Sequence, residues 1–142
     1  MADRRSAREL LMMLVYQMSV TDDWSDDERD CFLAEGEGMP KPNYRLDGKA
    51  DRAYFDAVLE AVRGHRDELD ELIEKASLNW KIKRISKVDL AILRLAAAEI
   101  LHADDIPISV SINEAVELAR KYGGEKSYEF VNGVLGKIVE PA

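Results

Sequence analysis

One stretch of the chain, residues 88–101, is apolar on nearly every side, and it constrains the fold more than any other segment. Only Asp89, Arg94 and Glu99 interrupt its sequence, VDLAILRLAAAEIL. Alanine and leucine are strong helix formers, and the stretch contains no glycine or proline. A helix without a polar face is normally buried in the middle of a domain. At about 1.5 Å per residue it is too short to cross a membrane. We therefore expect an all-α domain built around this helix.

Periodic apolar residues predict further helices on both sides of the central one. Spacings of three and four place these helices at residues 4–19, 51–64, 66–76 and 126–139. Ser111 and Glu114 have the spacing of a capping box, which predicts a helix that begins there and ends at Tyr122. Periodicity continues through Gly133, so we expect this glycine at a close helix–helix contact. With a short acidic helix included, the prediction is about seven helices in a single domain, residues 1–142.

Most of the negative charge lies in one segment. The chain has a formal net charge of −8, and the segment from Asp22 to Glu37 holds eight acidic residues against Arg29, which leaves about −1 elsewhere. A basic surface therefore remains possible outside this segment, although the overall charge argues against contacts with phosphates. We interpret residues 21–50 as an insert, a short helix capped by Ser25 and followed by a loop. Its acidic residues lack the spacing of a calcium-binding loop.

Residue types for catalysis or metal binding are few. The chain has two histidines and one cysteine, Cys31, and it shows no nucleophile–base pair, phosphate-binding glycine loop or zinc pattern. His65 has no second ligand at a usual spacing, which favours a role in a cap or loop over a metal site. The opening residues, MADRRSARELL, carry charges where a secretion signal needs an apolar run. We predict a non-enzymatic, cytoplasmic protein without cofactor, metal or membrane span.

Two basic stretches lie outside the acidic segment. Arginines open the first helix, where the helix dipole favours acidic residues, so they form either a solvated end or a patch for an anionic partner. The second stretch follows Trp80, which we expect to be a core or lid residue rather than a platform for nucleic-acid bases. Its cations are Lys81, Lys83, Arg84 and Lys87.

Four stretches of the chain together form a specific pattern. The run SINEAVELARKYGGEKSYEFVNGVLGKI is the most distinctive, and RRSARELLMMLVYQ stands at the start of the chain. Between them lie AYFDAVLEAVRGHRDELDELI and KVDLAILRLAAAEIL. This set resembles the NusB family of bacterial transcription antitermination factors over nearly the whole chain, except residues 21–50.

The resemblance implies a fold and a function. The fold would be two packed three-helix bundles around the central buried helix, with one additional helix. The function would be binding of a boxA-type RNA element in ribosomal RNA leader transcripts. The partner would be the small-subunit ribosomal protein that acts as NusE, and the complex would join the RNA polymerase elongation complex to suppress termination.

The resemblance also implies which residues carry the function. RNA contacts fall at two places, which we expect to meet in one cationic corner: Arg4, Arg5 and Arg8 at the start of the first helix, and Tyr122, Lys126 and Phe130 around the start of the last. Arginine suits phosphates and base edges, and aromatic rings can stack on unpaired bases. Tyr16 and Asp89 match positions that meet the ribosomal partner. Packing in the core is an alternative for Phe130 and Tyr16, and capping of the central helix is one for Asp89.

Two other functions are compatible with a helical domain of this kind. The same domain resembles the front of an RNA cytosine methyltransferase family, but the chain is too short to include the cofactor-binding domain of such an enzyme. A protein–protein adaptor or self-associating dimer without direct RNA binding is the second alternative, and the sequence leaves the oligomeric state open.

Overall fold

The computed structural model describes residues 4–33, 51–78 and 80–141. These residues form seven α-helices and one short 3-10 helix, η1. The helices are α1 (Arg4–Thr21), α2 (Asp26–Leu33), α3 (Arg52–Gly64), α4 (Arg66–Ala76), η1 (Ile82–Arg84), α5 (Lys87–His102), α6 (Ile108–Tyr122) and α7 (Ser127–Ile138). The loop expected after the short acidic helix of the insert lies outside the described residues. No helix in the described part of the chain is long and apolar enough to cross a membrane.

Helix α5 is the centre of the fold, as the sequence predicts. Every residue from Asp89 to Glu99 is buried, and the helix packs against α1, α3, α4, α6 and α7. Ser86 caps its start, because the Ser86 side chain accepts a hydrogen bond from the Asp89 backbone N–H at 3.2 Å. Burial on all sides explains why this helix has no polar face.

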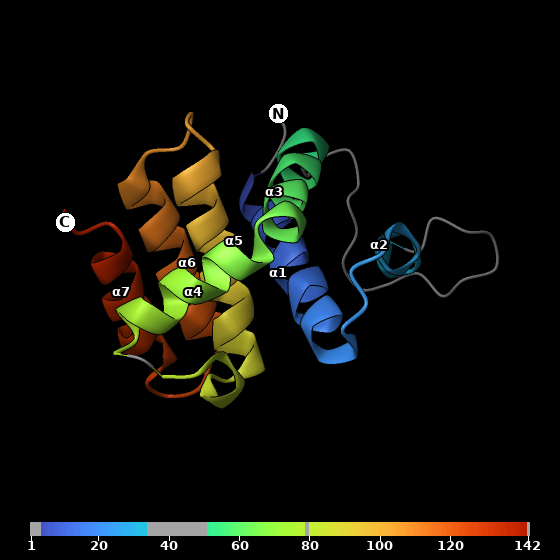
Figure 1. Ribbon diagram of the computed structural model, residues 1–142. Helices are drawn as coiled ribbons and strands as arrows, with labels where there is room; N and C mark the ends of the chain where they lie inside the picture. The colour runs from blue at the N-terminus through green and yellow to red at the C-terminus, as the bar shows by residue number, and fades with distance from the viewer. Residues whose placement is uncertain (1–3, 34–50, 79, 142) are drawn as a thin grey trace.

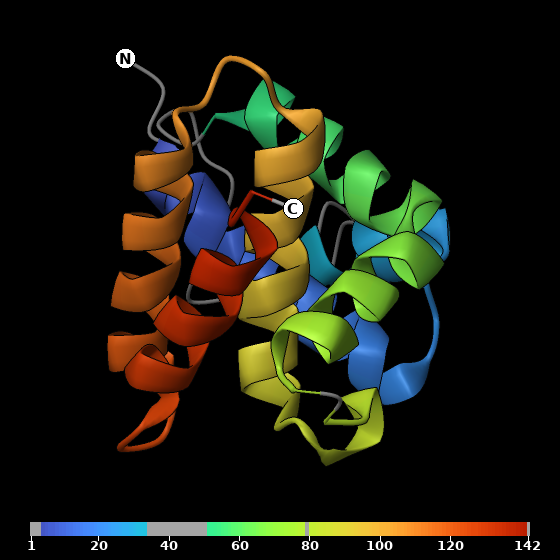
Figure 2. The same ribbon diagram turned by 60° about the vertical axis from the view of Figure 1, so that its left-hand side comes forward.

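The other helices surround α5 in two groups (Figures 1 and 2). Helices α6 and α7 pack against each other and against α5, and α1 and α3 do the same on another side of α5. Helix α4 crosses between the groups, because it contacts α3, α5 and α7. The all-α class and the seven helices of the prediction are confirmed for the described residues.

The helix starts follow local rules in the first half of the chain. Ser25 accepts from the Glu28 backbone N–H at 3.2 Å, and Asp51 accepts from that of Tyr54 at 2.9 Å. Both caps were predicted from the sequence. Each satisfies a backbone N–H that the first turn of a helix leaves without a partner.

Two local predictions in the second half are wrong. Helix α6 begins at Ile108, one turn before the predicted capping box, because the Pro107 carbonyl accepts from the N–H groups of Val110 and Ser111. Proline suits the start of a helix, where its missing N–H costs nothing. Ser111 is therefore buried inside the helix. Among the described residues a Cβ at Gly133 would have no atom within 4 Å, so this glycine does not make the expected close contact with another helix.

Two buried arginines connect the helix groups through α5. The Arg8 guanidinium from α1 donates to both carboxylate oxygens of Glu99, at 2.8 and 3.1 Å. Arg94 donates from α5 to both carboxylate oxygens of Asp70 on α4, at 2.8 Å each, and to the Ser19 hydroxyl on α1 at 2.8 Å. These bidentate pairs fix how α1 and α4 lie against the central helix.

Candidate nucleic-acid interface

Helices α1 and α6 border a surface pocket of about 350 Å³. Its lining is mostly charged and comprises Arg5, Arg8, Glu9, Glu114, Glu117, Leu118, Arg120 and Lys121. Four of these eight residues are cationic, which is a high share for a chain whose net charge is −8. The predicted arginines of α1 therefore face cations of α6 that the sequence analysis did not single out.

The three predicted arginines of α1 occupy different environments. Arg5 is 74% exposed and forms an ion pair with Glu114 at 2.9 Å. Arg4 is half-exposed and pairs with Asp51 at 3.2 Å and Asp105 at 3.0 Å. Exposed pairs of this kind contribute only about 0–1 kcal/mol, so a phosphate can compete with the carboxylate for the guanidinium.

Arg8 differs from Arg4 and Arg5 because it is buried. This burial argues against the RNA contact that was predicted for it. Arg8 is 5% exposed, and its guanidinium forms an ion pair with the buried carboxylate of Glu99. Burial alone would lower the pKa of Arg8, but the hydrogen bond to Glu99 and nearby negative charge raise it above its usual value. An RNA phosphate could bind this group only after a buried ion pair had broken. We therefore assign Arg8 to the architecture of the site and not to RNA contact.

The last two residues of α6 contact Glu9 on α1. The Lys121 ammonium donates to the Glu9 carboxylate at 2.7 Å, and the Tyr122 hydroxyl donates to the same carboxylate. Burial raises the pKa of Glu9, but these two hydrogen bonds outweigh it and leave the pKa below its usual value. Tyr122 is thus held beside α1 at Glu9.

Arg120 and Tyr128 extend the same surface toward α7. The Arg120 guanidinium lies over the Tyr128 ring, 4.2 Å from its centroid. The stacked pair presents a planar cation and an aromatic ring, which are the two groups that recognise unpaired nucleotides. Sequence reasoning could have found Arg120 and Lys121, because both fall outside the buried stripe of α6.

Lys126 and Phe130 lie apart from the opening arginines. The turn between α6 and α7, which contains Lys126, is at the opposite end of the molecule from the start of α1 (Figures 1 and 2). Within the described residues Lys126 is exposed and forms no ion pair. The prediction that the opening arginines and Lys126 meet in one cationic corner is therefore wrong. Instead a cationic strip follows α6 from Arg5, which pairs with Glu114, past Lys121, which pairs with Glu9, to Lys126.

Phe130 borders a second, apolar groove of about 380 Å³ between α4 and α7. Its ring centroid is 6.2 Å from that of Trp80, and both residues line the groove with Leu78 and Gly133. Trp80 is 56% exposed, so it is not the core residue that was one of its two predicted roles. The basic residues that follow it, Lys81, Lys83, Arg84 and Lys87, are exposed as well.

The two predicted partner residues are on α1 and α5, which pack against each other. Tyr16 is exposed on the surface of α1. Asp89 is 8% exposed, and its Oδ1 atom has no hydrogen-bond partner within the described residues. A buried acceptor without a donor costs about 1–3 kcal/mol.

Known proteins match the chain over most of its length. The sequence model of the NusB family matches residues 5–140. The chain is 47% identical over 137 residues to the transcription antitermination protein NusB of Acetivibrio thermocellus, across 96% of this chain and 88% of that protein. A structure of T. maritima NusB is similar with a TM-score of 0.77 and 30% identity, over 97% of this chain and 92% of that one.

A third match concerns the fold alone. The crystal structure of the antitermination factors NusB and NusE in complex with double-stranded RNA contains a chain that superposes with a TM-score of 0.76. The identity is 24%, and the superposition covers 94% of this chain and 93% of that one.

Proposed function

The chain belongs to the NusB family, whose members include transcription antitermination proteins, and on that premise we propose that it binds boxA-type RNA together with a ribosomal protein acting as NusE. The resulting complex would act on the RNA polymerase elongation complex in the cytoplasm and support transcription of ribosomal RNA operons. This function consists of recognition of RNA and protein, and it requires no catalytic group or cofactor.

The cationic strip along α6 carries this proposal. A chain of strongly negative net charge has little affinity for nucleic acid unless cations are gathered locally. Arg5, Arg120 and Lys121 line one pocket between α1 and α6, and the Tyr128 ring lies against Arg120. The proposed RNA-contacting residues are Arg4, Arg5, Arg120, Lys121, Tyr122, Lys126 and Phe130. Arg8 supports this surface from beneath.

Neutralising two cations of the strip should weaken RNA binding without unfolding the protein. We expect the double variant Arg5→Gln/Lys121→Gln to bind single-stranded boxA RNA about tenfold less tightly, with a salt-dependence slope smaller by about 1.4, since each phosphate contact contributes about 0.7. Fluorescence anisotropy of a labelled boxA RNA at several salt concentrations measures both quantities.

The matched control is Arg52→Gln/Lys75→Gln on α3 and α4. It changes the net charge equally, and both positions are exposed. We expect it to change RNA affinity less than twofold, about 0.4 kcal/mol, because its positions lie off the strip. Equal losses of RNA affinity in the two double variants would mean that the affinity depends only on the net charge of the protein. That result would contradict the assignment of the strip.

The ribosomal partner should depend on Tyr16 and Asp89. We expect Tyr16→Ala or Asp89→Asn to weaken its binding by about tenfold or more, since removal of a central tyrosine or of a buried polar group from an interface costs above about 1 kcal/mol. Isothermal titration calorimetry with the purified partner measures this affinity, and Lys75→Ala serves as the control. RNA binding by the protein alone should stay unchanged in these variants.

Addition of the partner also discriminates the two candidate functions. If both proteins bind one RNA strand, the partner should increase the RNA affinity, because the second contact is then intramolecular. The same RNA affinity with and without the partner would favour the adaptor function over RNA binding.

A further inference from the structure

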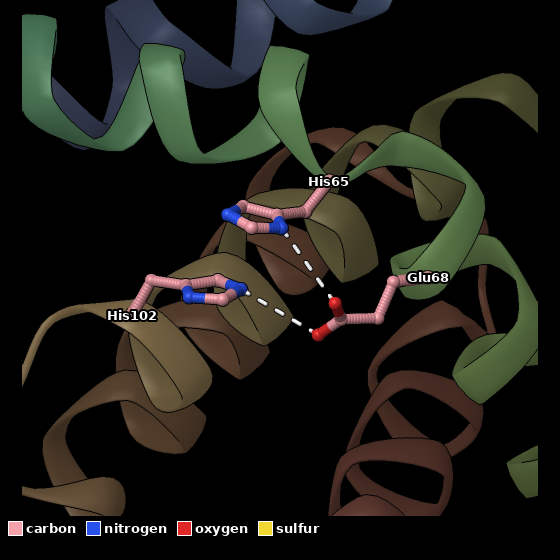
Figure 3. Close-up of side chains that lie close together, drawn as sticks. All are labelled: His65, Glu68 and His102. Carbon is pink, nitrogen blue, oxygen red and sulfur yellow. Dashed lines mark ion pairs between the residues drawn. The ribbon is translucent and has the colours of Figure 1, made fainter.

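The fold gathers both histidines of the chain around one carboxylate (Figure 3). His65 lies at the junction of α3 and α4, Glu68 is in the first turn of α4, and His102 is the last residue of α5. One ligand atom from each of the three lies within 4.8 Å of the other two. The sequence did not predict a metal site here, because His102 follows His65 by 37 positions and only the packing of α4 on α5 brings them together.

Both imidazole rings direct a nitrogen at Glu68 (Figure 3). The distance from His65 Nδ1 to Glu68 Oε2 is 3.6 Å, and that from His102 Nε2 to Glu68 Oε1 is also 3.6 Å. The rings are stacked, with centroids 3.9 Å apart and planes inclined by 13°. A neutral imidazole has one nitrogen lone pair, which lies in the plane of the ring and can bind a metal ion.

We propose that His65, Glu68 and His102 bind a divalent transition-metal ion, with Zn²⁺ as the best fit. Two imidazoles and one carboxylate are a known set of three protein ligands for zinc. Bond lengths near 2.0–2.2 Å and tetrahedral angles require donor atoms about 3.4 Å apart. The nitrogen–oxygen distances of 3.6 Å are close to that value. Rotation of the two imidazoles out of their nearly parallel stack would direct both lone pairs at one ion.

A shallow pocket next to the cluster leaves room for a fourth ligand. It has a volume of about 240 Å³, and His65 and Glu68 line it with Arg63, Arg66 and Asp67. Water from this pocket can occupy the open coordination position. The two arginines are engaged elsewhere: Arg63 pairs with Asp26 and Glu60, and the Arg66 guanidinium lies 4.6 Å from the centroid of the Trp24 ring.

The metal would connect the α3–α4 junction to the end of α5. The three side chains are between 26% and 52% exposed, so the site resembles a surface clamp rather than a buried structural zinc. It therefore binds the metal reversibly and stabilises the folded chain by mass action. Its position is independent of the cationic strip on α1 and α6, and the inference does not depend on the proposed RNA binding.

Titration of the chelator-treated, full-length chain with ZnCl₂ tests the site. We expect one equivalent to bind with micromolar affinity and to raise the Tm, and we expect Co²⁺ in its place to give the visible absorption of a four-coordinate ion. Loss of even a residue that only supports a metal ligand costs about 10–100-fold in affinity. His65→Gln and His102→Gln should therefore each weaken binding at least tenfold and abolish the rise in Tm.

Glu68→Gln and Asp67→Asn form a matched pair of variants. Both remove one negative charge from the same pocket, but only Glu68 is a proposed ligand. We expect Glu68→Gln to weaken Zn²⁺ binding at least tenfold and Asp67→Asn to leave it within about twofold. Equal affinities in these two variants, or a stoichiometry that the histidine variants leave unchanged, would overturn the proposal. Circular dichroism of each variant verifies that these surface changes leave the helices intact.

Discussion

Replacing Glu99 by alanine should lower the free energy of unfolding by about 3–5 kcal/mol, because it leaves the buried charge of Arg8 without a partner. Glu99 is buried and accepts hydrogen bonds from Arg8, Ser111 and Tyr54. These groups come from α1, α6 and α3, so one carboxylate connects three helices to α5. Urea unfolding monitored by circular dichroism measures the change.

Two further variants separate the lost ion pair from the lost side-chain volume. In Arg8→Met/Glu99→Leu no charge of this pair remains buried, and we expect it to regain part of the stability, since apolar replacement of a buried pair is often neutral. The recovery is incomplete because the buried hydroxyls of Tyr54 and Ser111 lose their acceptor. Glu117→Ala removes an exposed carboxylate that pairs with Arg120 at 3.7 Å, and should change stability by less than about 0.5 kcal/mol. A Glu99→Ala variant as stable as Glu117→Ala would show that Arg8 is hydrated and that the pair is not buried in solution.

Replacing Gly123 by alanine should destabilise the protein by about 1–3 kcal/mol, because the new methyl group overlaps its surroundings. A Cβ at Gly123 would lie 2.4 Å from Ser127 Cβ and 2.7 Å from the Ala119 carbonyl oxygen. The backbone φ of Gly123 is −87°, so the requirement for glycine comes from close approach and not from a left-handed conformation. Thermal and urea unfolding of the variant provide the measurement.

The neighbouring glycine provides the control for this change. A Cβ at Gly124 would be 3.9 Å from Ser127 Oγ, which is an ordinary contact, and alanine keeps the N–H that Gly124 donates to that oxygen at 2.8 Å. We expect Gly124→Ala to lie within about 0.5 kcal/mol of the unsubstituted protein. If both variants were equally destabilised, the reason would be the flexibility of the turn and not the contact with Ser127.

Local patterns predict the helices of this chain well. The burial of α5 follows from its lack of a polar face, and the caps at Ser25, Asp51 and Ser86 act within three residues of their own position. The predicted capping box at Ser111 was wrong because a neighbouring residue moved the start of the helix. Its spacing satisfies the local rule, but the preceding proline allows the helix to begin one turn earlier, and Ser111 then turns inward to Glu99.

Pairings between distant residues explain what the sequence could not predict about the site. Arg8 stands next to exposed arginines in the sequence, and only Glu99, 91 positions later, makes it a buried residue. The same holds for His65 and His102, which meet because α4 packs on α5. Trp80 was expected to be a core or lid residue, and its exposed ring lies at the edge of an apolar groove rather than in the core.

The central position of α5 also has a consequence for the synthesis of the chain. Two of the helices that cover it, α1 and α3, are made before it, and two others, α6 and α7, are made after it. A nascent chain that ends at His102 therefore displays one whole side of its most apolar helix to the aqueous medium. Complete folding has to wait until translation has delivered the last two helices, and until then the growing polypeptide is a natural client for chaperones that bind exposed apolar segments.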